Sequence, residues 1–303
     1  MTHSVVAANV GNILSPPALR EVMHGDFAGR ATLALRRLQD SAELPLGAGA
    51  TVAEGLNALD HWLERHYRNE YFYKNLVANK ILIGRHSVRT ATMLSEFAVG
   101  NSVADCVVVN GVATAYEIKT ELDTPARLRK QLDDYRRAFS RVAVVTHHSL
   151  ADPYLRMLED EPIGLLVLTP RGTLAEAKPI DDDPSRLSID VMFKALRKGE
   201  YTSATTNLTG YVPDVPNTQH FRACASRVEG LDPEAFHSEF RAQLRGRTLA
   251  AGVDDPALWA IRQLCFKLAP SPVALQNLFE WLGLRIGGCT TPICEASNMN
   301  SLP

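Results

Sequence analysis

Three charged side chains stand on two short apolar segments near the middle of the chain. Asp105 precedes residues 106–109, and Glu117 and Lys119 close the run V-A-T-A-Y-E-I-K. Because strand side chains alternate between two faces, Glu117 and Lys119 share a face, and pairing of the strands can bring Asp105 beside them. Two neighbouring carboxylates repel each other unless a cation lies between them. The trio therefore predicts a divalent-metal site with a lysine beside it.

The turn between the two strands decides whether this arrangement can form. A two-residue loop at Asn110-Gly111 would place Asp105 opposite Tyr116 and send Glu117 to the other side of the sheet. A three-residue loop with Gly111 in the left-handed conformation places both carboxylates on one face. We therefore expect an odd loop or a bulge here.

The residue types suit magnesium, or manganese in its place. Mg²⁺ usually binds one or two carboxylates and keeps several waters, so Asp105, Glu117 and the backbone carbonyl of Ile118 are the expected ligands. Such a metal lowers the pKa of a bound water and neutralises charge on a phosphate. Lys119 can hold the attacking water or stabilise the developing oxyanion. The alternative is a surface Glu-x-Lys with a nearby Asp, against which the apolar strands argue.

A helix after these strands carries two further candidates. Gln131 and Tyr135 stand four residues apart, hence on one helical face that is otherwise apolar. Polar tips on such a face need buried partners, and Lys119 or a phosphate can supply them. The alternative is that both side chains pack at the edge of the core.

Other polar residues nearby have simpler explanations. Asp123 is interpreted as a charge at the start of a helix, and His147 and His148 as exposed loop histidines. Two basic clusters are typical of phosphate-backbone binding, although solvated helix faces look the same. Their members are Arg65, Arg68, Lys74, Lys80, Arg85 and Arg89 in the first, and Arg127, Arg129, Lys130, Arg136, Arg137 and Arg141 in the second.

Composition limits the classes of protein to which the chain can belong. The 303 residues carry 32 Lys and Arg against 34 Asp and Glu, so bulk charge gives no general attraction to nucleic acid. Five scattered cysteines do not make a disulfide framework, and Cys289 and Cys294 lack a second pair of ligands for zinc. No stretch reaches the ~20 apolar residues of a membrane span. We expect a cytoplasmic protein that does not insert into membranes.

Hydrophobic periodicity predicts an α/β protein in four parts. Residues 1–85 are helical, residues 86–185 form the core, residues 186–286 are helical again, and residues 287–303 are a flexible tail. The core is expected as α-β-β-α-β-α-β, with a helix through residues 94–97. Its later strands, residues 141–146 and 163–169, are continuously apolar, as in a sheet covered on both faces.

The order of these residues resembles the PD-(D/E)XK nuclease superfamily. The likeness rests on Glu96, Asp105, Glu117-Ile118-Lys119 and Gln131-x-x-x-Tyr135. The segment AYEIKTELDTPARLRKQLDDY resembles sequences of the sce7726 family of bacterial and phage proteins. This second resemblance extends over most of residues 70–240. One departure is Ala104, which stands where the superfamily's name-giving proline precedes the first Asp.

The resemblance implies a restriction-endonuclease-like αβββαβ core with helical extensions at both ends. It implies a Mg²⁺- or Mn²⁺-dependent deoxyribonuclease that hydrolyses phosphodiester bonds, with Glu96 as an additional acidic metal ligand or else a surface residue. The alternative is a catalytically weak nuclease-fold module that binds nucleic acid or a protein partner, or itself, through its helical regions. Mobile elements or antiphage defence are the expected setting.

Overall fold

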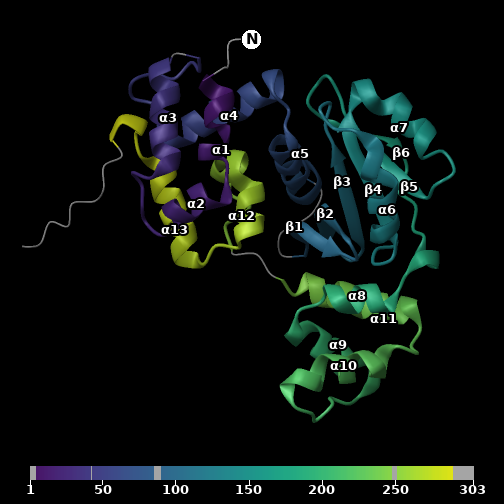
Figure 1. Cartoon of the computed structure of the whole chain (residues 1–303). Helices are drawn as coiled ribbons and strands as arrows, with labels where there is room; N and C mark the ends of the chain where they lie inside the picture. The colour runs from purple at the N-terminus through teal and green to yellow at the C-terminus, as the bar shows by residue number, and fades with distance from the viewer. Residues whose placement is uncertain (1–4, 42, 85–89, 248–250, 289–303) are drawn as a thin grey trace, which may run out of the picture. The chain divides into compact units, whose positions relative to one another are not determined.

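The computed structural model describes residues 5–41, 43–84, 90–247 and 251–288. The chain divides into two compact units (Figure 1), one formed by residues 1–61 and 270–303 and the other by residues 62–269. All the candidate catalytic residues belong to the second unit. Cys289, Cys294 and nearly all of the expected tail lie outside the described residues. No helix in the described ranges is long and apolar enough to cross a bilayer.

The first unit is helical and combines a segment from the N-terminal part of the chain with one from the C-terminal part. The indole N–H of Trp281 donates to Thr32 Oγ1 at 2.8 Å, and Asn277 Nδ2 donates to the carbonyl of Met23 at 2.9 Å. These bonds join the last long helix to the N-terminal helices, beside which it lies (Figure 1). The elements are α1 Val5–Ile13, α2 Pro16–Met23, α3 Arg30–Ser41, most of α4 Val52–His66, α13 Pro272–Gly283 and the short η6 Ile286–Gly288.

The second unit is built on one six-stranded sheet whose strands follow chain order. The first three strands are antiparallel, the third, fourth and fifth are parallel, and the last is antiparallel. The continuously apolar fourth and fifth strands are almost wholly buried, as their composition predicted. The strands are β1 Thr92–Val99, β2 Ser102–Val109, β3 Ala113–Lys119, β4 Arg141–His147, β5 Ile163–Leu168 and β6 Leu174–Lys178.

The turn between β2 and β3 has the odd length that the sequence predicted. Val109 pairs with Ala113, which leaves a loop of three residues, and Gly111 at its centre has φ +102°. That backbone conformation favours glycine. Continued toward the other ends of the strands, this register sets Asp105 opposite Glu117. The predicted odd loop is therefore confirmed.

The segment before β2 corrects the sequence analysis. Residues 94–97 were expected to be helical, but they lie within β1, and Glu96 is in mid-strand rather than at a helix end. Met, Leu and Glu favour helices in isolation, and pairing with β2 overrides that preference. Glu96 has φ +54°, and the pairing of β1 with β2 is interrupted there, between Ser95 and Phe97.

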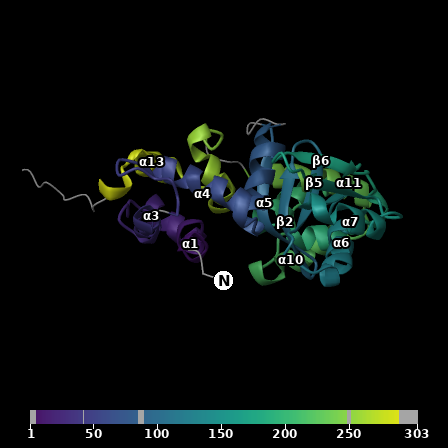
Figure 2. The same ribbon diagram turned by 90° about the horizontal axis from the view of Figure 1, so that it is seen from above.

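Helices cover both sides of the sheet (Figures 1 and 2). On one side lies α5, Glu70–Val77, which continues into the π-helical η1, Ala78–Ile83. On the other side α6, Leu128–Arg136, packs its residues Leu132 and Tyr135 into the main core. Helix α7, Ala151–Met157, lies beside α6. A single helical turn precedes each of them, η2 Pro125–Arg127 before α6 and η3 His148–Leu150 before α7.

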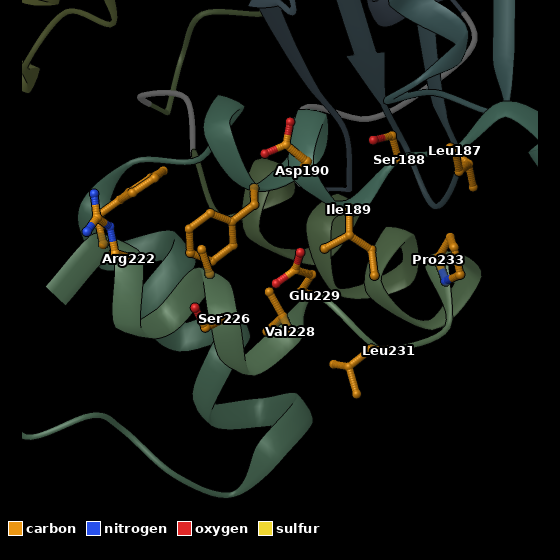
Figure 3. Close-up of a pocket in the computed structure, with 13 residues that line it drawn as sticks. Leu187, Ser188, Ile189, Asp190, Arg222, Ser226, Val228, Glu229, Leu231 and Pro233 are labelled. Carbon is orange, nitrogen blue, oxygen red and sulfur yellow. The ribbon is translucent and has the colours of Figure 1, made fainter. Parts of the chain in front are cut away.

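The later helices share a core with the sheet. The ring of Phe240 lies 6.4 Å from that of Phe97 on β1 and 5.7 Å from that of Phe139. A cavity of about 460 Å³ opens among three of these helices (Figure 3). The elements are η4 Pro184–Arg186, α8 Ile189–Ala195, α9 Lys198–Thr209, α10 Asn217–Val228, α11 Pro233–Arg245, η5 Pro256–Ile261 and α12 Arg262–Leu268.

Candidate active site

Four of the predicted side chains meet at the end of β3. Lys119 Nζ donates to Glu117 Oε1 at 2.7 Å and to Gln131 Oε1 at 3.2 Å. The hydroxyl of Tyr135 lies 2.6 Å from Glu117 Oε2. The strand period of two puts Glu117 and Lys119 on the face that α6 covers, and the helical spacing of four puts Gln131 and Tyr135 over them. Glu117 is 2 % exposed and Lys119 9 %, so this is a buried polar cluster.

Tyr135 ties the cluster to the neighbouring strand. Its hydroxyl also lies 2.7 Å from the carbonyl oxygen of Val103, so one hydroxyl hydrogen serves two acceptors. Burial and the nearby charge of Glu117 raise the pKa of Tyr135 well above its ordinary value. The phenol therefore acts as a neutral hydrogen-bond donor that fixes the orientation of the Glu117 carboxylate.

Asp105 lies where the β2–β3 ladder stops. The regular pairing ends at Cys106 and Tyr116, and Asp105 Oδ2 accepts the N–H of Ile118 at 2.7 Å. This contact uses the N–H of Ile118, and the expected role of its carbonyl as a metal ligand stays a prediction. Burial and the charge of Glu117 together raise the pKa of Asp105 to about 7. The register that sets Asp105 opposite Glu117 brings the two carboxylates close enough to interact.

Lys74 of α5 contributes to the site, although the sequence analysis placed it only in a basic cluster. Its Nζ lies 2.5 Å from Glu70 Oε1, 3.6 Å from Glu96 Oε1 and 3.5 Å from Asp105 Oδ1. Burial acts to lower the pKa of Lys74, but the surrounding carboxylates, Asp105 foremost, outweigh burial and raise it. A signal for Lys74 was available, since it lies four residues after Glu70 on a helix that is otherwise largely apolar.

Glu96 is one of the carboxylates around Lys74. It forms an ion pair with Lys267 of α12 in addition to its contact with Lys74. The hydrogen bond from Lys267 is the main reason that the pKa of Glu96 is lowered. Lys267 is distant in sequence and was not predicted. Glu96 is therefore a paired carboxylate on the Lys74 side of Asp105.

The donor chemistry of the site fits a hard divalent cation. Asp105 and Glu117 provide carboxylate oxygens, and the charge of Glu117 that raises the pKa of Asp105 is what a bound cation would offset. Lys74 now supplies positive charge at that position. Within the described ranges, no three His, Cys, Asp or Glu side chains converge as a ready-made metal cage. A cation held by these two carboxylates alone would keep several waters.

The remaining sequence candidates lie around the site. Asp123 Oδ2 accepts from the backbone N–H of Thr120 at 2.8 Å and from its hydroxyl at 2.9 Å, so it shapes the turn after β3. His147 is buried at the end of β4 and forms a bond of 2.8 Å with the hydroxyl of Ser149, whereas His148 is exposed. Of the second basic cluster, Arg136 bridges Glu161 and Asp183 inside the fold, while Arg127, Arg129 and Lys130 are exposed.

A further network, which the sequence analysis missed, continues from β3. Glu121 Oε1 accepts from Arg68 Nε at 2.9 Å, and Glu121 Oε2 accepts from the Tyr73 hydroxyl at 3.0 Å. His147 Nδ1 lies 3.6 Å from the same carboxylate. These contacts anchor the end of α4 and the start of α5 to the edge of the sheet where Lys119 lies.

Comparison with known families gives one result. Residues 64–249 match the family described as bacteriophage P4 protein cII, and this stretch contains the whole sheet, α6 and every candidate catalytic residue. No curated protein and no solved structure matches the chain. The match covers more than half of the sequence. The chain therefore belongs to the bacteriophage P4 protein cII family.

Proposed function

We propose that the protein is a divalent-metal-dependent nuclease that hydrolyses phosphodiester bonds in DNA. The observation that carries the proposal is the buried ammonium of Lys119, held between Glu117 and Gln131 at the end of a strand whose Ile118 N–H contacts Asp105. Asp105 and Glu117 are the proposed ligands of Mg²⁺ or Mn²⁺, and the sequence resemblance to the PD-(D/E)XK superfamily supports the same roles.

Each side chain has a task that its contacts support. An ammonium has three N–H donors, and in the described residues Lys119 uses two of them, on Glu117 and Gln131. The third is left for a water or a phosphate oxygen, where positive charge stabilises the transition state. Tyr135 and Gln131 orient Glu117 and Lys119 without reacting themselves. When bound, the metal would supply Lewis-acid stabilisation of the phosphate and a more acidic water.

Cleavage of labelled DNA tests this proposal directly. Duplex, single-stranded and branched DNA, with RNA for comparison, are incubated with Mg²⁺ or Mn²⁺ and with EDTA. We expect metal-dependent cutting by the parent protein and by Lys194→Met, which removes an exposed lysine of α8. Glu117→Gln and Lys119→Met should not cut. Metal-independent cutting, or cutting that survives both substitutions, would refute the assignment of the site.

One observation favours a second candidate, a nuclease-fold module that binds nucleic acid without cutting it. Both carboxylates already have an ammonium partner within the chain, Glu117 with Lys119 and Asp105 with Lys74. Such internal pairing satisfies buried charge without a metal. This candidate predicts DNA binding that is the same in EDTA and in Mg²⁺, with no cutting of any substrate.

A further inference from the structure

A polar cavity of about 500 Å³ lies at the carboxyl ends of β4 and β5, outside the cluster around Lys119. Its basic residues come from four places: Arg65 from the last turn of α4, Arg68 from the link between α4 and α5, His147 and His148 from the end of β4 and the turn after it, and Arg171 from the turn after β5. In open α/β sheets, ligands commonly bind in a crevice at the carboxyl ends of the strands. The cavity has the position of a binding site.

The charge of the cavity points to an anion. Three arginines line it against the single carboxylate of Glu64, together with His148 and with His147, whose pKa burial lowers. Among the described residues, neither Arg65 nor Arg171 has an ion-pair partner, and both are exposed. The planar guanidinium group matches the oxygens of a phosphate and binds them through two parallel hydrogen bonds.

One of the arginines is held in place by the fold. Arg68 donates through Nε to Glu121 Oε1 at 2.9 Å and through Nη1 to the carbonyl of Glu64 at 2.9 Å. Glu121 is itself anchored by the Tyr73 hydroxyl. Glu121 offsets part of the charge of Arg68, so the unpaired charge comes chiefly from Arg65 and Arg171.

The cavity opens at the same edge of the sheet as the candidate active site. Lys119 is paired with Thr146 on β4, and the Thr146 hydroxyl donates to the carbonyl of Lys119 at 2.7 Å. The next residue, His147, is paired with Leu168 on β5, and both line the cavity. Because neighbouring strands lie about 4.8 Å apart, β3 and β5 are separated by about 10 Å. Lys119 and Thr146 share one face of the sheet and His147 points to the other, so a nucleic acid strand that contacts both places must pass over the carboxyl end of β4.

A second large cavity among the described residues offers no such chemistry. It lies among α8, α10 and α11 and is lined by apolar residues that include Ile189, Val228 and Leu231 (Figure 3). Its charged residues are mixed, with Asp190 and Glu229 against Arg222. A phosphate would meet net negative charge there.

We propose that the cavity bounded by Arg65, Arg68, His147, His148 and Arg171 binds a phosphate group of the nucleic acid strand that enters the site at Lys119. This inference rests on the proposed function for the identity of the ligand. The phosphate comes either from a strand end or from the backbone between nucleotides. Holding it would set where along the strand the scissile bond falls.

Binding measured without catalysis separates this inference from the nuclease assignment. Fluorescence anisotropy in EDTA compares the parent with Arg65→Ala/Arg171→Ala, using single-stranded DNA with a 5′-phosphate, with a 5′-hydroxyl, and in closed circles. Arg156→Ala/Arg245→Ala is the matched control, because it removes two exposed arginines from elsewhere in the same unit. Both double variants remove the same charge.

We expect the cavity variant to bind at least about tenfold more weakly than the parent. Its slope of log Kd against log salt concentration should fall by about 1, while the control keeps the parental values. A loss confined to 5′-phosphorylated DNA identifies a terminal phosphate, and an equal loss on circles identifies an internal one. Equal behaviour of the cavity and control variants, or no binding by the parent, overturns the inference. If the cavity binds phosphate but the protein cuts no substrate, the inference about the cavity stands and the catalytic proposal is refuted.

Discussion

The ammonium nitrogen of Lys74 lies 3.5 Å from Oδ1 of Asp105, between that carboxylate and those of Glu70 and Glu96. Its side chain is 6 % exposed, so this is a buried cation among anions. A metal that uses Asp105 must share the carboxylate with Lys74 or displace the ammonium from it. Lys74 is therefore expected to weaken metal binding while stabilising the metal-free protein.

The substitution Lys74→Met tests both effects. Without metal, the free energy of unfolding should fall by about 1–3 kcal/mol, because the largely buried carboxylate of Asp105 loses its cation. Mn²⁺ should bind more tightly than it does to the parent and restore the stability. Urea unfolding and calorimetric titration with Mn²⁺ measure the two effects, and Lys194→Met, which breaks an exposed ion pair, is the control. Unchanged Mn²⁺ affinity would contradict the competition.

The raised pKa of Asp105 predicts a pH dependence of stability in EDTA. Because its folded-state pKa of about 7 lies above the ordinary value, the stabilising contribution is fully present below about pH 4 and is lost as pH rises through 7. The loss is on the order of 2–4 kcal/mol. Asp105→Asn should remove this part of the pH dependence, whereas the exposed Asp133→Asn should keep it. Urea unfolding between pH 4 and 8 measures this loss of stability. If the free energy of unfolding of the parent and of Asp105→Asn changed with pH in parallel, Asp105 would not be its source.

The hydroxyl of Tyr135 should matter more than that of another buried tyrosine. Tyr135→Phe removes the bonds to Glu117 and Val103 and is expected to cost about 1–2 kcal/mol of stability. Tyr154 is also buried and has no hydrogen-bond partner in the described residues, so Tyr154→Phe should be nearly neutral. Equal unfolding midpoints for the two variants would show that Tyr135 packs without positioning Glu117.

The turn that sets the register depends on glycine. Gly111→Ala is expected to cost about 1 kcal/mol, because φ +102° is unfavourable for a residue with a Cβ atom. An added Cβ would meet no atom there, so the cost isolates the backbone. Gly199, in α9, has equally open space and no positive φ, and Gly199→Ala should instead be neutral or stabilising. Thermal unfolding compares them, and a harmless Gly111→Ala would contradict the account of the turn.

Local periodicity was enough to predict the centre of the site. Alternation on β3 places Glu117 with Lys119, helical spacing places Gln131 with Tyr135, and the loop length follows from the need to align Asp105 with Glu117. These relations connect residues that are close in sequence. The mixed α/β class, with helices before and after the sheet, was predicted for the same reason.

The contacts that were missed depend on tertiary packing. Lys74 and Lys267 reach Asp105 and Glu96 from helices far away in sequence, which no local pattern reveals. The strand around Glu96 was predicted to be helical because its residues favour helices until β2 pairs with them. Helix α9 lies in the segment predicted to be helical, but its apolar residues do not form a stripe, and all four of its threonines bond to carbonyls four residues earlier.

The central claim is that Lys119 acts on the phosphodiester while Glu117 holds it in place. The most direct measurement is the single-turnover rate of DNA cleavage in Mg²⁺ by the parent and by Lys119→Met, with DNA binding measured separately in EDTA. We predict a rate at least about 100-fold lower for Lys119→Met, with binding unchanged. A rate within a few-fold of the parent at equal binding would contradict the claim, because the buried ammonium would then only stabilise the fold.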